Sequence, residues 1–179
     1  VRSRLSRLLR KIPIIVFINK LDREGKDAFD LMDEVEQKLG LTVTPLSFPI
    51  GMGYDFQGIY NLWEKNVNLF SGDSRKNIEE TIAISDVASN ELDHLIGEKP
   101  AQKLREELEL LDEVYPKFDR DQYLAGNLQP VFFGSALNNF GVRELLDCFV
   151  TIAPSPRPKD SETRTVEPTE TKLSGFVFK

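Results

Sequence analysis

Apolar positions near the start of the chain alternate between two spacings. Residues 12–19, IPIIVFIN, form a short, β-branched and almost continuously apolar run, which is typical of a strand buried on both faces of a parallel sheet. Residues 26–40 instead place apolar side chains at helical spacing, at Phe29, Met32, Val35 and Leu39. Gly40 is well placed to end this helix, and residues 41–51 return to an extended pattern. The pattern therefore predicts a βαβ unit.

The middle of the chain predicts a different mixture of elements. Short extended segments separated by turn residues lie in residues 54–70 and again in residues 79–85. Residues 89–97 and 100–118 predict helices, and residues 119–127 add a short one. The longest of these helices has one apolar face, formed by Leu104, Leu108, Leu111 and Val114. Its other face is mainly Glu and Asp, which indicates a solvated surface.

A second apolar strand and a helix follow before the chain becomes polar. Residues 129–137, QPVFFGSAL, predict a strand that enters a turn of small residues, and residues 141–156 predict a helix ended by prolines. Residues 154–172 are polar and rich in proline, so we expect a linker. Residues 173–179 alternate and predict a further strand. Together these elements predict an α/β fold with a parallel sheet.

Composition and charge exclude some classes of protein. The chain has 179 residues, 40% of them hydrophobic, which is ordinary for a globular protein. Its net charge of −6 argues against a general or sequence-specific nucleic-acid binder. Five basic residues and no acidic one lie in the first eleven positions, where Leu5, Leu8 and Leu9 form an apolar stripe. We therefore predict a helix with a solvated basic face at this end.

Single residues limit the chemistry further. Cys148 is the only cysteine, so no internal disulfide can form, and this fits a reducing cytoplasm. We expect the Cys148 side chain to be buried on a helix. His94 is the only histidine, so we expect no metal site and no Ser/His/Asp or Cys/His triad. We predict that His94 occupies a solvent-facing position on a helix. The longest apolar run, residues 12–18, is much shorter than the roughly 20 residues of a membrane span.

Polar residues at the end of the first strand carry the candidate chemistry. Asn19, Lys20 and Asp22 stand in the order Asn-Lys-x-Asp, with which GTP-binding proteins recognise guanine. The carboxylate of Asp22 can accept hydrogen bonds from guanine N1–H and from its amino group. Asn19 can donate to guanine N7 and tie down neighbouring loops, and the aliphatic stem of Lys20 can cover the ring. The alternative is a set of polar residues that only cap a strand.

A second candidate element follows the second apolar strand. Ser135, Ala136 and Leu137 form a Ser-Ala-x turn, which in GTP-binding families presents backbone N–H groups to guanine O6. Small residues suit such a turn because the backbone has to approach the ring closely. Alone, the turn could simply cap the helix that follows. Two such elements, each at the end of a predicted core strand, favour a guanine site.

Longer stretches of sequence give the same indication. The chain resembles the translational GTPases in INKLDRE, FPIGMGYDFQGIYNL, LAGNLQPVFFGSALNNFGVRELLD, APSPRP and SGFVFK. Within that family it is most similar to the branch of bacterial peptide chain release factor 3, over nearly all of residues 12–179. Elongation factor G is similar in NKLDR, in the pattern PIG...F.GI..L and in the helix followed by PSP, but PVFFGSALNNFGV and GFVFK resemble the release-factor branch. The first eleven residues resemble neither branch.

The resemblance implies a P-loop GTPase domain with a partial doubly wound sheet, an inserted α+β subdomain and the first strand of a β-barrel. The implied parts are GTPase-domain portions at 1–53 and 128–153, the insertion at 54–127, a linker at 154–172 and the barrel start at 173–179. It also implies a GTP hydrolase that binds GTP or GDP with Mg2+ and works on the ribosome. There it would promote departure of a class-one release factor in translation termination.

The phosphate-binding half of such a domain is not found in this sequence. No G-x-x-x-x-G-K-[ST] motif occurs, and the nearest match, Gly53 to Gly58, continues with Ile59 instead of Lys. The Asp-x-x-Gly sequences that begin at Asp22 and Asp55 do not precede Asn-Lys-x-Asp, as the Mg2+-linked switch does in these families. We therefore expect a piece of a longer GTPase that is inactive alone. The alternatives are a fragment of an elongation factor G-like translocase and a non-catalytic module that binds the ribosome.

Overall fold

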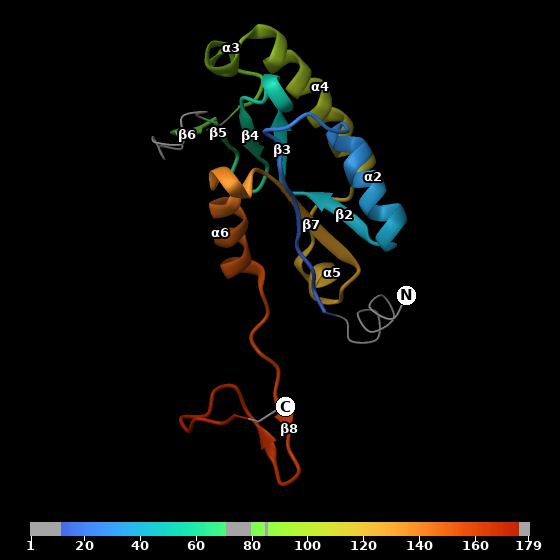
Figure 1. Cartoon of the computed structure of the whole chain (residues 1–179), viewed down its shortest axis with the longest axis vertical. Helices are drawn as coiled ribbons and strands as arrows, with labels where there is room; N and C mark the ends of the chain where they lie inside the picture. Colours follow the sequence, from blue (N-terminus) through green and yellow to red (C-terminus); the bar gives the residue numbers. More distant parts are fainter. Residues whose placement is uncertain (1–11, 71–79, 85, 176–179) are drawn as a thin grey trace.

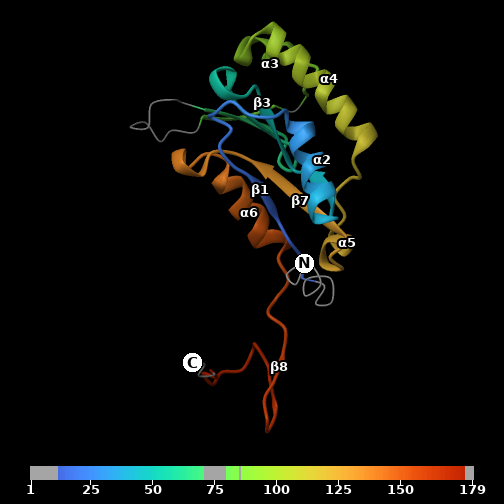
Figure 2. The same cartoon turned by 45° about the vertical axis from the view of Figure 1, so that its right-hand side comes forward.

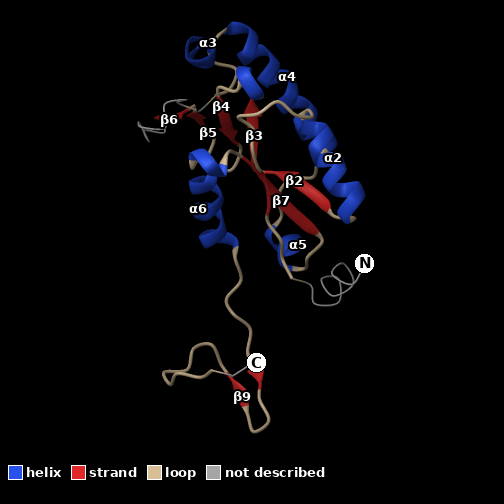
Figure 3. Ribbon diagram, in the orientation of Figure 1, coloured by secondary structure: helices blue, strands red, loops and turns tan. Residues whose placement is uncertain are grey.

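A computed structural model describes residues 12–70, 80–84 and 86–175 of the chain (Figure 1). The helix predicted for the first eleven residues lies outside this range, and so does the end of the predicted terminal strand, residues 176–179. The described part contains a three-stranded parallel and a four-stranded antiparallel sheet with helices packed around them, and a separate two-stranded antiparallel hairpin (Figures 1 and 3). It is an α/β fold, as the sequence predicts.

A three-stranded parallel sheet forms one part of the core. Its strands are β1 (Val16–Ile18), β7 (Leu128–Phe133) and β2 (Thr42–Pro45), in the order β1-β7-β2. All six residues of β7 are buried, because this strand pairs with a neighbour on each side and its side chains enter a buried cluster on each face of the sheet. The predicted βαβ unit is therefore present, but a strand from much later in the chain separates its two strands.

Helices α2 (Ala28–Leu39) and α6 (Val142–Ile152) lie on opposite sides of this sheet (Figures 1 and 2). The Asp27 carboxylate caps the start of α2 by accepting the Phe29 N–H at 2.9 Å, and Gly40 ends the helix in the left-handed conformation. Two buried clusters flank β7: Met32 of α2 belongs to the larger and Cys148 of α6 to the smaller. Burial raises the pKa of the Cys148 thiol to about 11.

The extended segment predicted at residues 41–51 is two strands in two different sheets. It divides at Leu46, whose N–H donates to the Val131 carbonyl while its own carbonyl accepts the Leu62 N–H, each at 2.9 Å. The second sheet is antiparallel, in the order β3 (Ser47–Ile50), β4 (Gly58–Asn61), β5 (Asn66–Leu69), β6 (Glu80–Ala83). Because β3 pairs with β4, this sheet runs across the predicted boundary between residues 53 and 54.

The predicted helices between the two sheet regions are present as α3 (Asn90–Ile96), α4 (Glu98–Val114) and α5 (Arg120–Leu124). His94 is exposed on α3, as predicted. The predicted apolar face of α4 is wrong at its end, because Val114 is 58% exposed. The helix stops there and the backbone turns extended at Tyr115, so Tyr115 is buried instead. At the end of α2, Leu39 is likewise exposed although its spacing predicts burial.

Arg105 of α4 holds the neighbouring helix and the segment before it. Its guanidinium donates to both carboxylate oxygens of Asp93, at 2.9 and 2.7 Å, and to the carbonyls of Val87 and Ser89. The hydrogen bonds from Arg105 lower the pKa of the Asp93 carboxyl.

Arg105→Lys is therefore expected to lower the midpoint of thermal unfolding, since an ammonium cannot reproduce this planar set of donors. The folded state lowers the pKa of Asp93, so the difference should be full above about pH 4 and should shrink as the pH falls through that lowered pKa. Calorimetric scans at neutral and acid pH measure this. Arg143→Lys, which changes an exposed ion pair with Asp147 on α6, is the matched control. A difference that does not shrink in acid would contradict the role of Asp93.

The segment predicted to be a linker contains a short hairpin. Helix α6 ends at Ile152, before the prolines, as predicted. The chain then extends away from the sheets, and β8 (Lys159–Asp160) pairs antiparallel with β9 (Thr165–Val166) (Figure 3). Residues 173–175 form no strand. Among the described residues, no helix is both long and apolar enough to cross a membrane.

Candidate guanine-base site

The ends of β1 and β7 place the two predicted recognition elements next to each other. The strands are parallel and their last paired residues are Ile18 and Phe133, so both chains leave the sheet at the same edge. The Gly134 N–H donates to the Ile18 carbonyl at 3.0 Å, and the Leu21 N–H donates to the Gly134 carbonyl at 3.2 Å. These bonds extend the pairing of the strands into the two loops. They bring residues 19–22 beside residues 135–137.

The side chain of Asn19 joins the two loops directly. Its Oδ1 accepts the N–H of Lys20 and the N–H of Ala136, both at 2.8 Å. Asn19 and Ala136 are 117 positions apart in the sequence, so this bond forms only when both strands are in place. With Oδ1 engaged in this way, the Asn19 amide nitrogen is left available to donate to a ligand.

Leu21 anchors the loop around Asp22 in the core. Leu21, only 2% exposed, lies in the core, and its carbonyl accepts the Gly53 N–H at 3.0 Å. Lys20 has a positive φ of 74°, which turns the backbone so that Leu21 points inward between two polar neighbours. Lys20 is exposed and Asp22 half-buried, and among the described residues neither side chain forms a hydrogen bond or ion pair. Both are therefore free to contact a ligand.

The turn after β7 is fixed by its own hydrogen bonds. Ser135 and Phe140 exchange backbone hydrogen bonds of 3.0 Å, and the Asn138 side chain donates to the Ser135 hydroxyl at 2.9 Å. Between them lies the 3-10 turn η2 (Ala136–Asn138), with Leu137 84% exposed. No hydrogen bond links the Leu137 N–H to another described residue. This N–H is thus the available donor for an acceptor such as guanine O6.

Two residues of this site were missed by the sequence reasoning. Leu21 is the variable position of Asn-Lys-x-Asp, yet it anchors the loop. Gly134 lies where the two loops meet, and a Cβ there would stand 2.3 Å from the Phe140 carbonyl oxygen and 2.8 Å from the Phe17 ring. A glycine between a buried strand and a turn of small residues was the signal that could have identified it.

The Asp-x-x-Gly sequences lie in different surroundings. Gly58 is a paired residue of β4, and a Cβ on it would stand 2.1 Å from the Asn68 carbonyl, so its small size serves the packing of β4 against β5. Asp55 lies in a short 3-10 turn, η1 (Gly53–Asp55), and is exposed. Within the described ranges, no group of three or more His, Cys, Asp or Glu side chains could hold a metal ion.

A comparison with protein-family models matches residues 4–155 to the model of the elongation factor Tu GTP binding domain. This match spans most of the chain and includes both candidate loops, residues 19–22 and 135–137. The chain belongs to the translational GTPase family. Members of this family bind GTP or GDP with Mg2+ and interact with the ribosome. In this translational GTPase chain, the candidate contacts for the guanine base are the Asn19 amide, the Leu137 N–H and the Asp22 carboxylate, at the ends of β1 and β7. Its sequence has no phosphate-binding motif, so we assign no residue to the phosphates or to Mg2+.

Asn19→Ala tests the link between the two loops. Losing Oδ1 leaves the N–H groups of Lys20 and Ala136 to water, so we expect the free energy of unfolding to fall by about 1 kcal/mol. Hydrogen exchange at the Ala136 amide should become faster. Urea denaturation and exchange measured by NMR check these effects. Asn90→Ala, at an exposed asparagine of α3, is the control. Unchanged exchange at Ala136 would show that Asn19 does not hold this turn.

Proposed function

We propose that this chain supplies the guanine-base recognition of a translational GTPase. In this proposal, Asp22 accepts the N1–H and amino group of guanine, Asn19 donates to N7, and the Lys20 stem covers the ring. The N–H of Leu137, in the turn formed by Ser135 and Ala136, donates to O6. The observation that carries the proposal is the bond of Asn19 Oδ1 to Ala136, because it assembles both loops into one surface.

The nucleotide partner is GTP or GDP, and the phosphates and Mg2+ would be held by residues outside this sequence. Hydrolysis of GTP therefore belongs to the longer protein of which we infer this chain is a piece, and this chain alone is inactive. In this proposal, residues 1–53 and 128–153 are portions of the GTPase domain, 54–127 the insertion, 154–172 the linker and 173–179 the start of a barrel. Strand β3, which pairs with β4, continues the sheet of the insertion into the first of these portions.

More specifically, we propose that the protein acts in translation termination. The support is the similarity of PVFFGSALNNFGV and GFVFK to the branch of peptide chain release factor 3. Its partners would be the ribosome and a class-one release factor, which leaves the ribosome after the peptide is released. The site of action would be the cytoplasm.

The test is a turnover assay with ribosomes stalled at a stop codon. A protein that carries this chain, with GTP, should raise the number of peptides released per class-one release factor. Asp22→Asn should reduce this effect, and Asp30→Asn, at an exposed aspartate of α2, should not. A protein that instead moves messenger RNA through the ribosome would be an elongation factor G-like translocase. Equal stimulation without nucleotide would favour a non-catalytic ribosome-binding module.

A further inference from the structure

Ser47 links the antiparallel sheet to the strand end from which the turn at residues 135–137 leaves. It is the first residue of β3 and is completely buried, at 0% exposed. Its hydroxyl oxygen accepts the backbone N–H of Phe133 at 2.9 Å. Phe133 is the last residue of β7, and only Gly134 separates it from the turn. A side chain that belongs to neither candidate loop therefore holds the end of β7.

The hydroxyl of Ser47 supplies an acceptor that strand β2 does not provide. Strand β2 pairs with β7 only as far as Val131, because the chain leaves the parallel sheet at Leu46. Every second N–H of a strand points to the same neighbour, so the Phe133 N–H lies on the side of β7 where Val131 contacts Leu46. A buried N–H without an acceptor destabilises the fold. Ser47 satisfies this N–H where the backbone pairing has ended.

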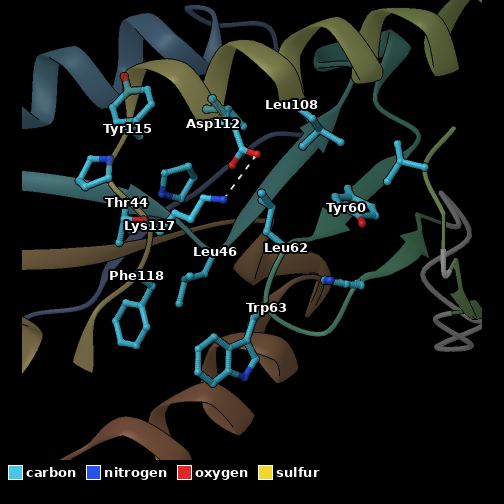
Figure 4. A pocket seen from close by; sticks show the side chains of 15 residues that line it. Thr44, Leu46, Tyr60, Leu62, Trp63, Leu108, Asp112, Tyr115, Lys117 and Phe118 are labelled. Atoms are coloured by element: carbon cyan, nitrogen blue, oxygen red, sulfur yellow. Dashed lines mark ion pairs between the residues drawn. The ribbon is translucent and has the colours of Figure 1, made fainter. Parts of the chain in front are cut away.

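The corner between β2 and β3, which carries Ser47, is itself held in place. Leu46 is 4% exposed and packs in the smaller of the two buried clusters. Its backbone bonds to Val131 and Leu62, each at 2.9 Å. Figure 4 shows Leu46 and Leu62 in the lining of a pocket beside the end of α4, a pocket that Ser47 does not line. Loss of the Ser47 hydroxyl would therefore release Phe133 and leave the corner in place.

Aromatic rings next to the same sheet support the far end of the turn. Phe140 closes the turn through its backbone bonds with Ser135. Its ring meets those of Phe56 and Phe70 edge-on, with centroids 5.6 and 5.4 Å apart. Phe56 lies shortly before β4, and Phe70 directly follows β5. Ser47 before the turn and Phe140 after it thus connect both ends of the turn to the antiparallel sheet.

Loss of the Ser47 hydroxyl should act mainly on the turn and little on the other loop. Residues 19–22 are anchored separately, through the bond of 3.0 Å between the Leu21 carbonyl and the Gly53 N–H. The turn contains the Leu137 N–H, the donor that we assign to guanine O6. A hydrogen bond weakens steeply as its angle departs from linear, so a small displacement of the turn is enough to weaken this contact.

We propose that Ser47 is a positioning residue for the recognition of guanine O6. It fixes the end of β7, and with it the direction of the Leu137 N–H, without touching the nucleotide. The antiparallel sheet thereby takes part in base recognition, although none of the residues assigned to the base lies in it. This role rests on the proposed function, because it requires that guanine binds at the two loops.

Two nucleotides that differ only at position 6 of the base test this role. GDP carries an oxygen there and 6-thio-GDP a sulfur, which is a weaker acceptor, while both keep the N1–H and the amino group. In a translational GTPase that carries this chain, Ser47→Ala should weaken GDP about threefold, part of one hydrogen bond, and leave 6-thio-GDP nearly unchanged. Competition calorimetry measures the ratio of the two affinities. A loss of folding stability alone would lower both affinities equally and leave their ratio unchanged.

Three further variants separate the hydroxyl from the space that it fills. Ser47→Cys keeps the volume with a poor acceptor and should change the ratio as the alanine does, whereas Ser47→Thr keeps the hydroxyl and should preserve it. Gln129→Met is the matched control, because Gln129 is also buried in β7 and its amide donates to the Gly126 carbonyl at the opposite end of the strand. It should leave the ratio unchanged. Circular dichroism checks the folding of each variant.

Two outcomes would overturn this role of Ser47 alone, in a protein that prefers GDP to ADP. One is an unchanged ratio in both Ser47→Ala and Ser47→Cys. The other is an equal change in Gln129→Met, which would show that any loosening of β7 has the same effect. Equal binding of GDP and ADP by the unaltered protein would instead show that the guanine site itself is wrong, and the role of Ser47 would be lost with it.

Discussion

Asp22→Asn is expected to weaken GDP binding by about 1.5–3 kcal/mol in a translational GTPase that carries this chain, the scale of a hydrogen bond to a charged group. The carboxylate is half-buried and has no partner among the described residues, so it can accept both guanine donors. An asparagine can accept only one of them, and its amide group meets the guanine amino group donor to donor. Xanthine has a carbonyl in place of that amino group, so the same substitution should improve binding of xanthosine diphosphate.

Calorimetric titration of both nucleotides into both proteins measures this exchange of specificity. Asp30→Asn removes the same charge from an exposed position of α2 and should change neither affinity. A general loss of GDP binding without any gain for the xanthine nucleotide would indicate damage to the loop. Unchanged binding of both nucleotides would show that Asp22 does not contact the base.

Gly134→Ala is expected to destabilise the chain by about 3 kcal/mol, because the added methyl group meets atoms that cannot easily move. The nearest are the Phe140 carbonyl oxygen at 2.3 Å and the Phe17 ring at 2.8 Å. Phe140 belongs to the bridge that closes the turn, and Gly134 itself bonds to both Ile18 and Leu21. Relief of the clash would therefore also move residues 19–22 and 135–137 apart.

Urea denaturation gives the stability of this variant. Gly25→Ala is the matched control in the neighbouring loop, since a Cβ there meets only the Met52 sulfur at an ordinary 3.7 Å. The control should change the free energy of unfolding by less than about 1 kcal/mol. If both variants were equally stable, the close approach at Gly134 would not limit the structure.

Elements with local signals could be predicted from the sequence. The start and end of α2 are marked by Asp27 and Gly40, and both act as caps. The buried β7 is a continuous apolar run with a small-residue turn after it. Predictions failed where residues far away in the sequence determine the local structure. The segment at residues 41–51 reads as one strand, but Leu46 divides it because its backbone bonds lead to Val131 and Leu62.

The sequence predicts which residues belong to the candidate site, but not the hydrogen bonds that join its two loops. The motif predicts that Asn19 contacts guanine and ties down neighbouring loops, yet no local pattern shows that its Oδ1 accepts the N–H of a residue 117 positions later. The same limit applies to Leu21, whose burial depends on the loop at Gly53. The hairpin of β8 and β9 was missed because prolines and polar residues predict a linker. Only the folded chain brings these partners together.

The most direct test of guanine recognition is an NMR titration of this chain, labelled with nitrogen-15, using millimolar GDP and, separately, ADP. The two loops are already joined by Asn19 and Gly134, so the surface that we propose for the base forms from residues of this chain alone. We predict weak binding of GDP, with shifts at the amides of residues 19–22 and 135–137, and none there with ADP. Shifts elsewhere only, or the same shifts with both nucleotides, would contradict the account.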